Sequence, residues 1–241
     1  MKSSAHSVFI FSFILYYTLA NFQPAHLNVV TKFERKDSIT YLERLMINAG
    51  LKLVVDYDST IKIKLLYSTT DNFMRKDIYG DLDKAYLLPY VCKRLAAAQK
   101  YLKSKHPGYS LIIYDAARPF ICQQMLWDYA PLSASQKPLY VSSPRKTSLH
   151  NYGAAVDVAI VNENNVQLDF GTPFDFFGEE SQPQKEQQLL TQGKLTSKQI
   201  ENRKLLRDVM KAGGFSSIKT EWWHFNAASR KTAMEKFKLI R

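Results

Sequence analysis

An acidic residue in the middle of an apolar segment constrains the fold of this chain more than any other sequence feature. The segment Ala154-Ala-Val-Asp-Val-Ala-Ile-Val161 reads as a strand, and Asp157 is its only polar residue. An ionised carboxylate in apolar surroundings needs a cation, a metal or several hydrogen-bond donors. The fold must therefore supply a partner for Asp157, although a role in capping a neighbouring loop would also satisfy this residue.

The other segments mix strands and helices without regular alternation. Hydrophobic spacing and terminating residues predict helices over residues 38–48, 83–104, 119–129 and 197–211, and strands over 61–67, 110–114, 154–161 and from 221 onward. Residues 131–148 are predicted to form a loop, and the Gln-rich residues 179–192 a mobile surface excursion. This order favours an α+β fold, with a central, mainly antiparallel sheet flanked by helices, over a doubly wound parallel sheet.

The first twenty residues have the features of a secretory signal peptide. Lys2 precedes an apolar run over residues 8–19, and the small residues Thr18 and Ala20 precede the expected cleavage site. The apolar run is too short for a transmembrane helix, which needs roughly 20 residues. We therefore predict a signal peptide over residues 1–20, a single domain over 21–241, and a periplasmic or secreted protein without stable membrane insertion.

The chain is basic, with 33 Lys and Arg residues against 22 Asp and Glu residues and a formal net charge of +11. The basic residues are scattered along the sequence, which is typical of a solvated surface. We therefore expect no nucleic-acid partner, whereas loose association with an anionic cell wall is compatible with the charge.

Two cysteines, Cys92 and Cys122, leave the redox chemistry open. They could form one disulfide in an oxidising compartment. Each also lies in an apolar helical pattern, where a buried free thiol is equally natural.

Two of the five histidines have a carboxylate at a suggestive spacing. His150 precedes Asp157 by seven residues, and His224 follows Glu221 by three, whereas His106 lies in a His-Pro-Gly turn typical of a solvated position. Zinc binds imidazole and carboxylate groups, and a catalytic zinc site has three protein ligands and one open position. The joint pattern HxxxxxxD followed by ExxH is more specific than either half alone, and it indicates a metal site.

Glu221 and His224 can share one site only under a condition on the backbone. Residues three apart on a regular strand point to opposite faces, so the strand must begin or bulge between the two residues. Trp222 and Trp223 would then provide apolar surroundings that raise the pKa of Glu221, which suits a general base. The alternative is a surface glutamate on an aromatic-rich core strand.

Arg118 lies where the strand over residues 110–114 leads into the next helix. An arginine at such a junction can donate hydrogen bonds to the oxyanion that forms when a peptide carbonyl is attacked. A structural ion pair with Asp115 is the alternative.

At these residues the sequence resembles the D-alanyl-D-alanine dipeptidases of the vancomycin-resistance type, a branch of the peptidase M15 family of zinc enzymes that shares its fold with the hedgehog signalling domain. The resemblance covers most of the chain after residue 66. It is carried by the ordered motifs Tyr67-Ser-Thr-Thr-Asp-Asn-Phe73, Asp115-Ala-Ala-Arg-Pro119, Ser148-Leu-His-Asn-Tyr-Gly-Ala-Ala-Val-Asp157, Gly171-Thr-Pro-Phe-Asp-Phe176, Gly214-Phe215 and Glu221-Trp-Trp-His-Phe225. Where the family often has Asp-Gly-Tyr-Arg-Pro, this chain has no aromatic residue before Arg118.

The resemblance implies a zinc metallopeptidase that hydrolyses D-Ala-D-Ala or a similar short dipeptide of peptidoglycan metabolism, with one zinc ion per chain. It assigns His150, Asp157 and His224 as metal ligands, Glu221 as the base and Arg118 as the transition-state stabiliser. Asp175 is assigned to the free amino terminus of the substrate. Two alternatives stay open: a D,D- or L,D-carboxypeptidase that trims peptidoglycan stem peptides, and a non-catalytic binding module of the same fold.

Overall fold

The predicted apolar strand, β5 (Ala155–Val161), lies at the centre of the fold, and all seven of its residues are buried. The computed structural model describes residues 39–241. The predicted signal peptide, His6 and His26 lie outside the described residues.

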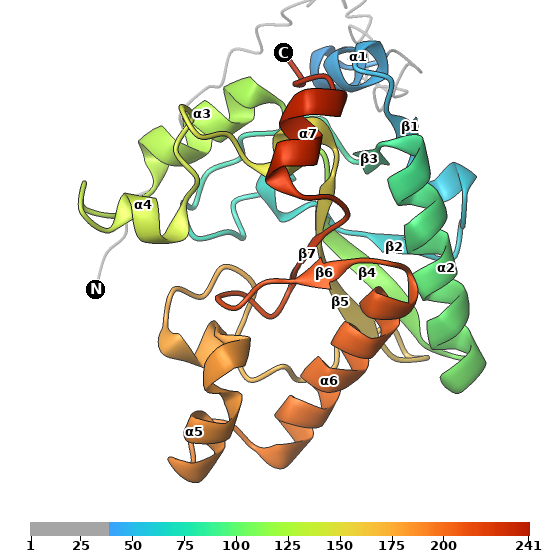
Figure 1. The fold of residues 1–241 in the computed structure, drawn as a ribbon, viewed down its shortest axis with the longest axis vertical. Coiled ribbons are helices and arrows are strands. Elements are labelled where there is room, and N and C mark those ends of the chain that lie inside the picture. The colour runs from blue at the N-terminus through green and yellow to red at the C-terminus, as the bar shows by residue number, and fades with distance from the viewer. Residues whose placement is uncertain (1–38) are drawn as a thin grey trace, which may run out of the picture. The chain divides into compact units, whose positions relative to one another are not determined.

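The sheet that contains β5 is mixed. Its strands follow the order β2-β4-β5-β7-β6 (Figure 1), with β2 parallel to β4 and the other three pairs antiparallel. The bounds are β2 (Lys62–Ile63), β4 (Ser110–Asp115), β6 (Ser216–Ser217) and β7 (His224–Asn226). The predicted α+β class is confirmed, whereas the mainly antiparallel sheet is confirmed only in part. The connection from β2 to β4 contains a long helix, and such a crossover permits parallel pairing.

The two longest helices pack against each other and against strands of this sheet. α2 contacts β4 and α6, and α6 also contacts β6 (Figure 1). Where α6 ends, a Cβ atom on Gly213 would lie 2.5 Å from the backbone oxygen of Arg94 in α2. The end of α6 can approach α2 this closely only because glycine has no side chain. The helices are α1 (Tyr41–Asn48), α2 (Pro89–Lys105), α3 (Phe120–Tyr129), α4 (Lys137–Tyr140), α5 (Glu186–Thr191), α6 (Ser197–Ala212) and α7 (Arg230–Lys236).

Local sequence explains where the first two helices begin. Thr40 and Glu43 form a capping box at the start of α1, in which each side chain accepts a hydrogen bond from the other residue's backbone N–H. α2 begins at Pro89, later than predicted, because proline suits the first turn of a helix. The residues before Pro89 form β3 (Tyr86–Leu87), which pairs with β1 (Lys52–Leu53) in a separate two-stranded sheet.

Three predicted segments differ in the structure. The strand predicted over residues 61–67 is reduced to β2, after which a 3₁₀ turn (Leu66–Ser68) buries Tyr67. The loop predicted over residues 131–148 contains α4. The surface excursion predicted over residues 179–192 is folded into two 3₁₀ turns and α5, and Leu189 is fully buried there.

Both cysteines are free and buried, Cys92 in α2 and Cys122 in α3. The disulfide alternative is therefore not realised in the structure. No helix within residues 39–241 has the length and apolar character that crossing a bilayer requires.

Candidate active site

Three adjacent strands bring acidic and imidazole side chains to the same level of the sheet. Asp157 of β5 pairs with His224 of β7 on one side and with Asp115 of β4 on the other. A register shift between Ile113 and Asp115 accompanies the second pairing. Cross-strand neighbours lie about 5 Å apart, so the pairing alone places Asp157 beside His224. This is the partner that the sequence analysis required for Asp157.

His150 reaches the same place from η3 (Leu149–Tyr152), a 3₁₀ helix that precedes β5. Ser148 caps this helix, and Gly153 ends it with a φ angle of 64°. A Cβ atom on Gly153 would lie 2.7 Å from the side chain of Leu51, so this position requires glycine for its backbone angle and for space. The sharp turn at Gly153 lets His150 and Asp157 face one point although η3 and β5 differ in direction.

The three predicted metal ligands converge. His224 Nδ1 lies 2.9 Å from Asp157 Oδ1 and 3.2 Å from His150 Nε2, and one ligand atom from each residue falls within 4.8 Å of the others. The opposite ring nitrogens face oxygen acceptors: His150 Nδ1 lies 2.7 Å from the Ala116 carbonyl, and His224 Nε2 lies 2.8 Å from Asn226 Oδ1. An N–H on each outward nitrogen leaves the inward lone pairs for a metal ion, an arrangement found at zinc sites. The donor set of two imidazoles and one carboxylate therefore fits zinc.

Strong electrostatic coupling accompanies this convergence. Burial opposes ionisation of Asp157, but the two imidazoles outweigh it and hold its pKa well below the ordinary range. Burial also opposes protonation of His224, but the hydrogen bond and charge of Asp157 raise the pKa of His224 to about 9. A metal ion is bound by neutral imidazole and ionised carboxylate, so metal binding at these residues would be coupled to loss of a proton from His224.

Glu221 lies just before β7, which satisfies the backbone condition because the strand begins only at His224. Its Oε2 atom is 3.9 Å from His224 Nδ1. Burial raises the pKa of Glu221, and the nearby charge of Asp157 adds to this rise. The direction of this pKa shift agrees with the prediction, and Glu221 lies beside the three predicted metal ligands, where its carboxyl can exchange a proton with a ligand in the pocket.

The Arg118 side chain forms the ion pair with Asp115 that was considered as the alternative role, and it also lines the pocket. Its Nε donates to Asp115 Oδ2 at 3.0 Å, its Nη2 also donates to Asp115, and its Nη1 donates to Gln123 at 2.9 Å. Tyr79 donates to the other oxygen of Asp115 at 2.6 Å. A guanidinium carries five N–H donors. Three are used, so two remain for a ligand, and the structural and catalytic interpretations of Arg118 do not exclude each other.

Asp175 lies across the pocket from the metal ligands. Its φ angle is 59°, a left-handed conformation, and its Oδ2 accepts a hydrogen bond of 2.8 Å from the Tyr67 hydroxyl. Burial raises the pKa of Asp175 well above its ordinary value, although the Tyr67 hydrogen bond opposes this rise. The neighbouring groups therefore do not stabilise the ionised form of Asp175 enough to offset its burial, and a cationic ligand would stabilise that form.

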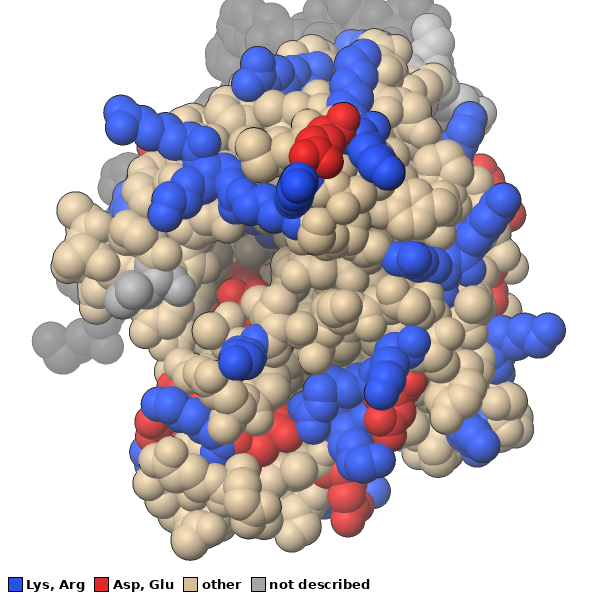
Figure 2. All heavy atoms as spheres, in the orientation of Figure 1, with Lys and Arg blue, Asp and Glu red and all other residues tan. Residues whose placement is uncertain are grey.

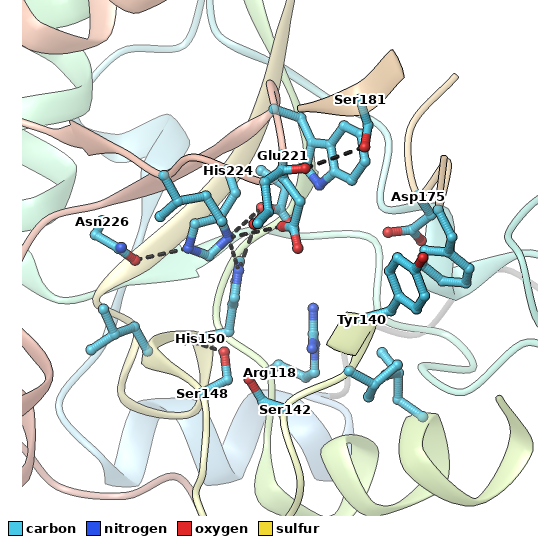
Figure 3. Close-up of a pocket in the computed structure, with 18 of the residues that line it drawn as sticks. Arg118, Tyr140, Ser142, Ser148, His150, Asp175, Ser181, Glu221, His224 and Asn226 are labelled. Carbon is cyan, nitrogen blue, oxygen red and sulfur yellow. Dashed lines mark hydrogen bonds and ion pairs between the residues drawn. The ribbon is translucent and has the colours of Figure 1, made fainter. Parts of the chain in front are cut away.

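These side chains surround one pocket of about 550 Å³. In Figure 3 the carboxyl groups of Glu221 and Asp175 and the guanidinium of Arg118 all point into the space between the two histidines and Tyr140. Figure 2 shows the hollow with acidic side chains at its floor and with Lys and Arg side chains gathered above it. The pocket can therefore take a small ligand that carries positive charge at the Asp175 end and a polar reacting group near the histidines.

Besides Gln123 and Tyr79, two further contributing side chains were not predicted. Tyr67 holds Asp175, and its ring lies 5.2 Å from the Arg118 guanidinium carbon. Asn226 orients His224. A period of two places Asn226 on the same strand face as His224, so a signal for this residue was present in the sequence.

Comparisons with known proteins agree with this geometry. The Peptidase_M15 family model, described as D-ala-D-ala dipeptidase, matches residues 49–239, a range that includes every candidate site residue. The D-alanyl-D-alanine dipeptidase of Escherichia coli (strain K12) is 33% identical over 165 residues, which cover 68% of this chain and 78% of that protein. The enzyme of the same name from Enterococcus faecium is 26% identical over 177 residues, which cover 66% of this chain and 82% of that protein. A solved LdcB LD-carboxypeptidase aligns with a TM-score of 0.38 and 19% identity over 62% of this chain and 63% of that chain, too weakly to carry an argument.

Proposed function

Because this chain belongs to the Peptidase M15 family of D-Ala-D-Ala dipeptidases, we propose that it hydrolyses D-Ala-D-Ala or a similar short dipeptide. His150, Asp157 and His224 would hold one zinc ion. The observation that carries the proposal is that the three ligands, Glu221 and Asp175 line the same pocket.

The side chains divide the chemistry between them. Zinc, when bound, supplies a Lewis acid that acidifies water and polarises the scissile carbonyl. Glu221 accepts a proton from the attacking water on its carboxylate and later donates it to the leaving amine. The two free N–H groups of Arg118 donate to the oxyanion, while Asp115 and Gln123 hold the guanidinium in place.

Asp175 would bind the ammonium group of the substrate. The ammonium would provide the positive charge that the carboxyl lacks in this pocket, and the Tyr67 hydroxyl would keep the carboxyl in position. A substrate whose ammonium must reach Asp175 while its peptide bond lies near Glu221 is short. This argument favours a dipeptidase over a carboxypeptidase that trims longer stem peptides.

A rate comparison tests the proposal. Free D-Ala-D-Ala and its N-acetylated form would be offered to the zinc-loaded protein, with and without a chelator. Acetylation removes the positive charge and leaves Asp175 unpaired, a loss of about 2 to 5 kcal/mol for a buried charged pair. We expect much faster cleavage of the free dipeptide, cleavage that stops on chelation, and a smaller preference in Asp175→Asn.

Other outcomes select the alternatives. Equal rates on free and acetylated dipeptide would favour a carboxypeptidase and leave Asp175 a structural residue. Bound zinc without any hydrolysis would favour a binding module of the same fold. Export to the periplasm or the medium, where peptidoglycan fragments occur, is part of the proposal and is supported by the sequence of residues 1–20.

A further inference from the structure

The segment that carries Asp175, residues 169–182, is tied at both ends to one side chain of α6. Arg203 is fully buried, and its Nε donates to the Phe170 carbonyl at 2.7 Å while its Nη2 donates to the Glu180 carbonyl at 2.8 Å. Phe170 and Glu180 lie five residues before and five residues after Asp175. A single guanidinium therefore closes the segment into a loop of defined width.

The same segment is bonded to the two residues that flank Glu221. The indole N–H of Trp222 donates to Thr172 Oγ1 at 2.8 Å. The Ser181 hydroxyl lies beside Glu221 in Figure 3, and its one proton is shared between the Gly178 carbonyl at 2.8 Å and the Thr220 carbonyl at 3.2 Å. These bonds and Arg203 together connect the carboxyl proposed to bind the ammonium with the carboxyl proposed to activate water.

Stability alone does not account for a guanidinium at this position. Burial lowers the pKa of Arg203 to about 10, and its Nη1 has no hydrogen-bond partner among residues 39–241. The nearest carboxylate, Glu186, lies 3.7 Å from Nη1 and forms its close ion pair with Arg207 instead. Well-packed apolar residues often stabilise a core as well as a buried ion pair does. The guanidinium presents its N–H donors in a rigid planar fork, so Arg203 can hold two separate carbonyls at a fixed separation.

We propose that Arg203, which does not line the pocket, is a positioning residue that sets the distance between Asp175 and Glu221 and so limits the substrate to a dipeptide. The inference rests on the proposed function. A tripeptide cleaved at its last bond carries its ammonium about 3.5 Å further from that bond. A fixed separation of the two carboxyl groups therefore accepts one length and rejects the next.

The test compares Arg203→Met with Arg207→Met in the zinc-loaded protein. Arg207 lies on the same helix and binds the same Glu186, but it is partly exposed and makes no hydrogen bond to residues 169–182, which makes it a matched control. The readout is the ratio of kcat/KM for D-Ala-D-Ala to that for D-Ala-D-Ala-D-Ala. A misplacement of about 1 Å in an active site costs up to about 100-fold.

We expect Arg203→Met to lower this ratio by about tenfold or more, mainly through a higher KM for the dipeptide, with zinc content unchanged. Arg207→Met should keep the ratio of the parent protein, and Arg203→Lys should lie between the two. An unchanged ratio in folded Arg203→Met would overturn the inference.

Two milder variants cover the case in which Arg203→Met does not fold. Thr172→Val and Ser181→Ala each remove one of the bonds beside Glu221, and each should lower the same ratio. Parent-like ratios in both variants would overturn the inference. Asp175→Asn separates it from the proposed function. If Asp175→Asn leaves the ratio unchanged, the proposed role of Asp175 fails; if only Asp175→Asn lowers it, the positioning role of Arg203 fails.

Discussion

Glu221 is the residue whose role can be separated most cleanly from metal binding. It lies 3.9 Å from His224 and is not among the three converging ligands. We therefore expect Glu221→Gln to retain zinc and to lose activity by about 100-fold to 10,000-fold, the range for a general base. Elemental analysis and dipeptide turnover would measure both quantities.

His150→Ala is the control for this prediction, because it removes a ligand and should lose zinc as well as activity. A Glu221→Gln protein that cannot hold zinc would show that Glu221 is a ligand and that the assigned roles are wrong.

Arg118 allows the structural and catalytic interpretations to be measured side by side. Arg118→Lys keeps a positive charge near Asp115. It removes the planar set of N–H donors that binds Asp115 and Gln123 and also faces the pocket. We expect kcat to fall by about 100-fold or more, as when an oxyanion donor is lost, with little change in zinc content. If thermal stability falls while kcat is unchanged, Arg118 has only its structural role.

The type and spacing of four residues indicated a metal site, the family resemblance assigned their roles, and the structure brings their side chains together in one pocket. His150, Asp157, Glu221 and His224 are unusual residues in apolar or glycine-containing surroundings, and their joint pattern is specific. Tyr67 was not predicted as a site residue because it lies 108 residues from Asp175 in sequence and meets it only through the tertiary fold. The Ala116 carbonyl, which faces His150 Nδ1, is a backbone group, so no residue type in the sequence indicates its role.

At the scale of elements, α1 provides a pH-dependent contribution to stability. The buried Glu43 carboxylate accepts hydrogen bonds from the Thr40 backbone N–H, from Lys84 and from the Tyr86 hydroxyl. Burial raises the pKa of Glu43, but these bonds outweigh burial and lower it to about 2 from an ordinary value of 4.5. The folded state therefore favours the ionised form. The stabilising effect of the Glu43 carboxylate on the folded state is complete above about pH 4.5 and is lost as the pH falls toward 2.

We expect Glu43→Gln to lower the free energy of unfolding at pH 7 by about 1 to 3 kcal/mol and to have a smaller effect near pH 3. Urea unfolding of both proteins at the two pH values would measure this. Glu235→Gln is the control, because Glu235 is exposed on α7 and its single ion-pair contact within residues 39–241, with Lys231, is long at 4.0 Å. An equal effect of Glu43→Gln at both pH values would contradict the assigned pKa.

Helices and strands were predicted well where the hydrophobic pattern is continuous, and poorly where tertiary contacts determine the local structure. α6 and β5 match their predicted ranges within one residue, because α6 buries residues at helical spacing and β5 is a continuous apolar segment that is buried throughout. Residues 179–192 are polar in composition, so the sequence indicated a surface excursion. Their order comes from long-range contacts, above all the pairing of Glu186 with Arg207 and the burial of Leu189, which composition does not reveal.

For the whole molecule, the metal ligands couple ion binding to folding. His150 comes from η3, Asp157 from β5 and His224 from β7, so an ion bound by all three ties these elements together. A ligand that binds only the folded state adds about 4 kcal/mol when its concentration is 1,000 times its Kd. We expect chelation to lower Tm by several degrees and zinc to restore it, as measured by thermal unfolding.

His150→Ala again serves as the control, since its Tm should not respond to zinc or chelator. A parent protein whose Tm is the same with zinc and with chelator would contradict the assignment of these three residues as a metal site.

The two buried thiols have a consequence for how the protein can be handled and where it can fold. Burial raises the pKa of Cys92 to about 12 and that of Cys122 to about 12, so neither forms the thiolate that oxidants and alkylating agents attack. The native state therefore requires no oxidising partner. Because the fold contains no bond between these cysteines, we expect the native state to form equally under reducing and oxidising conditions.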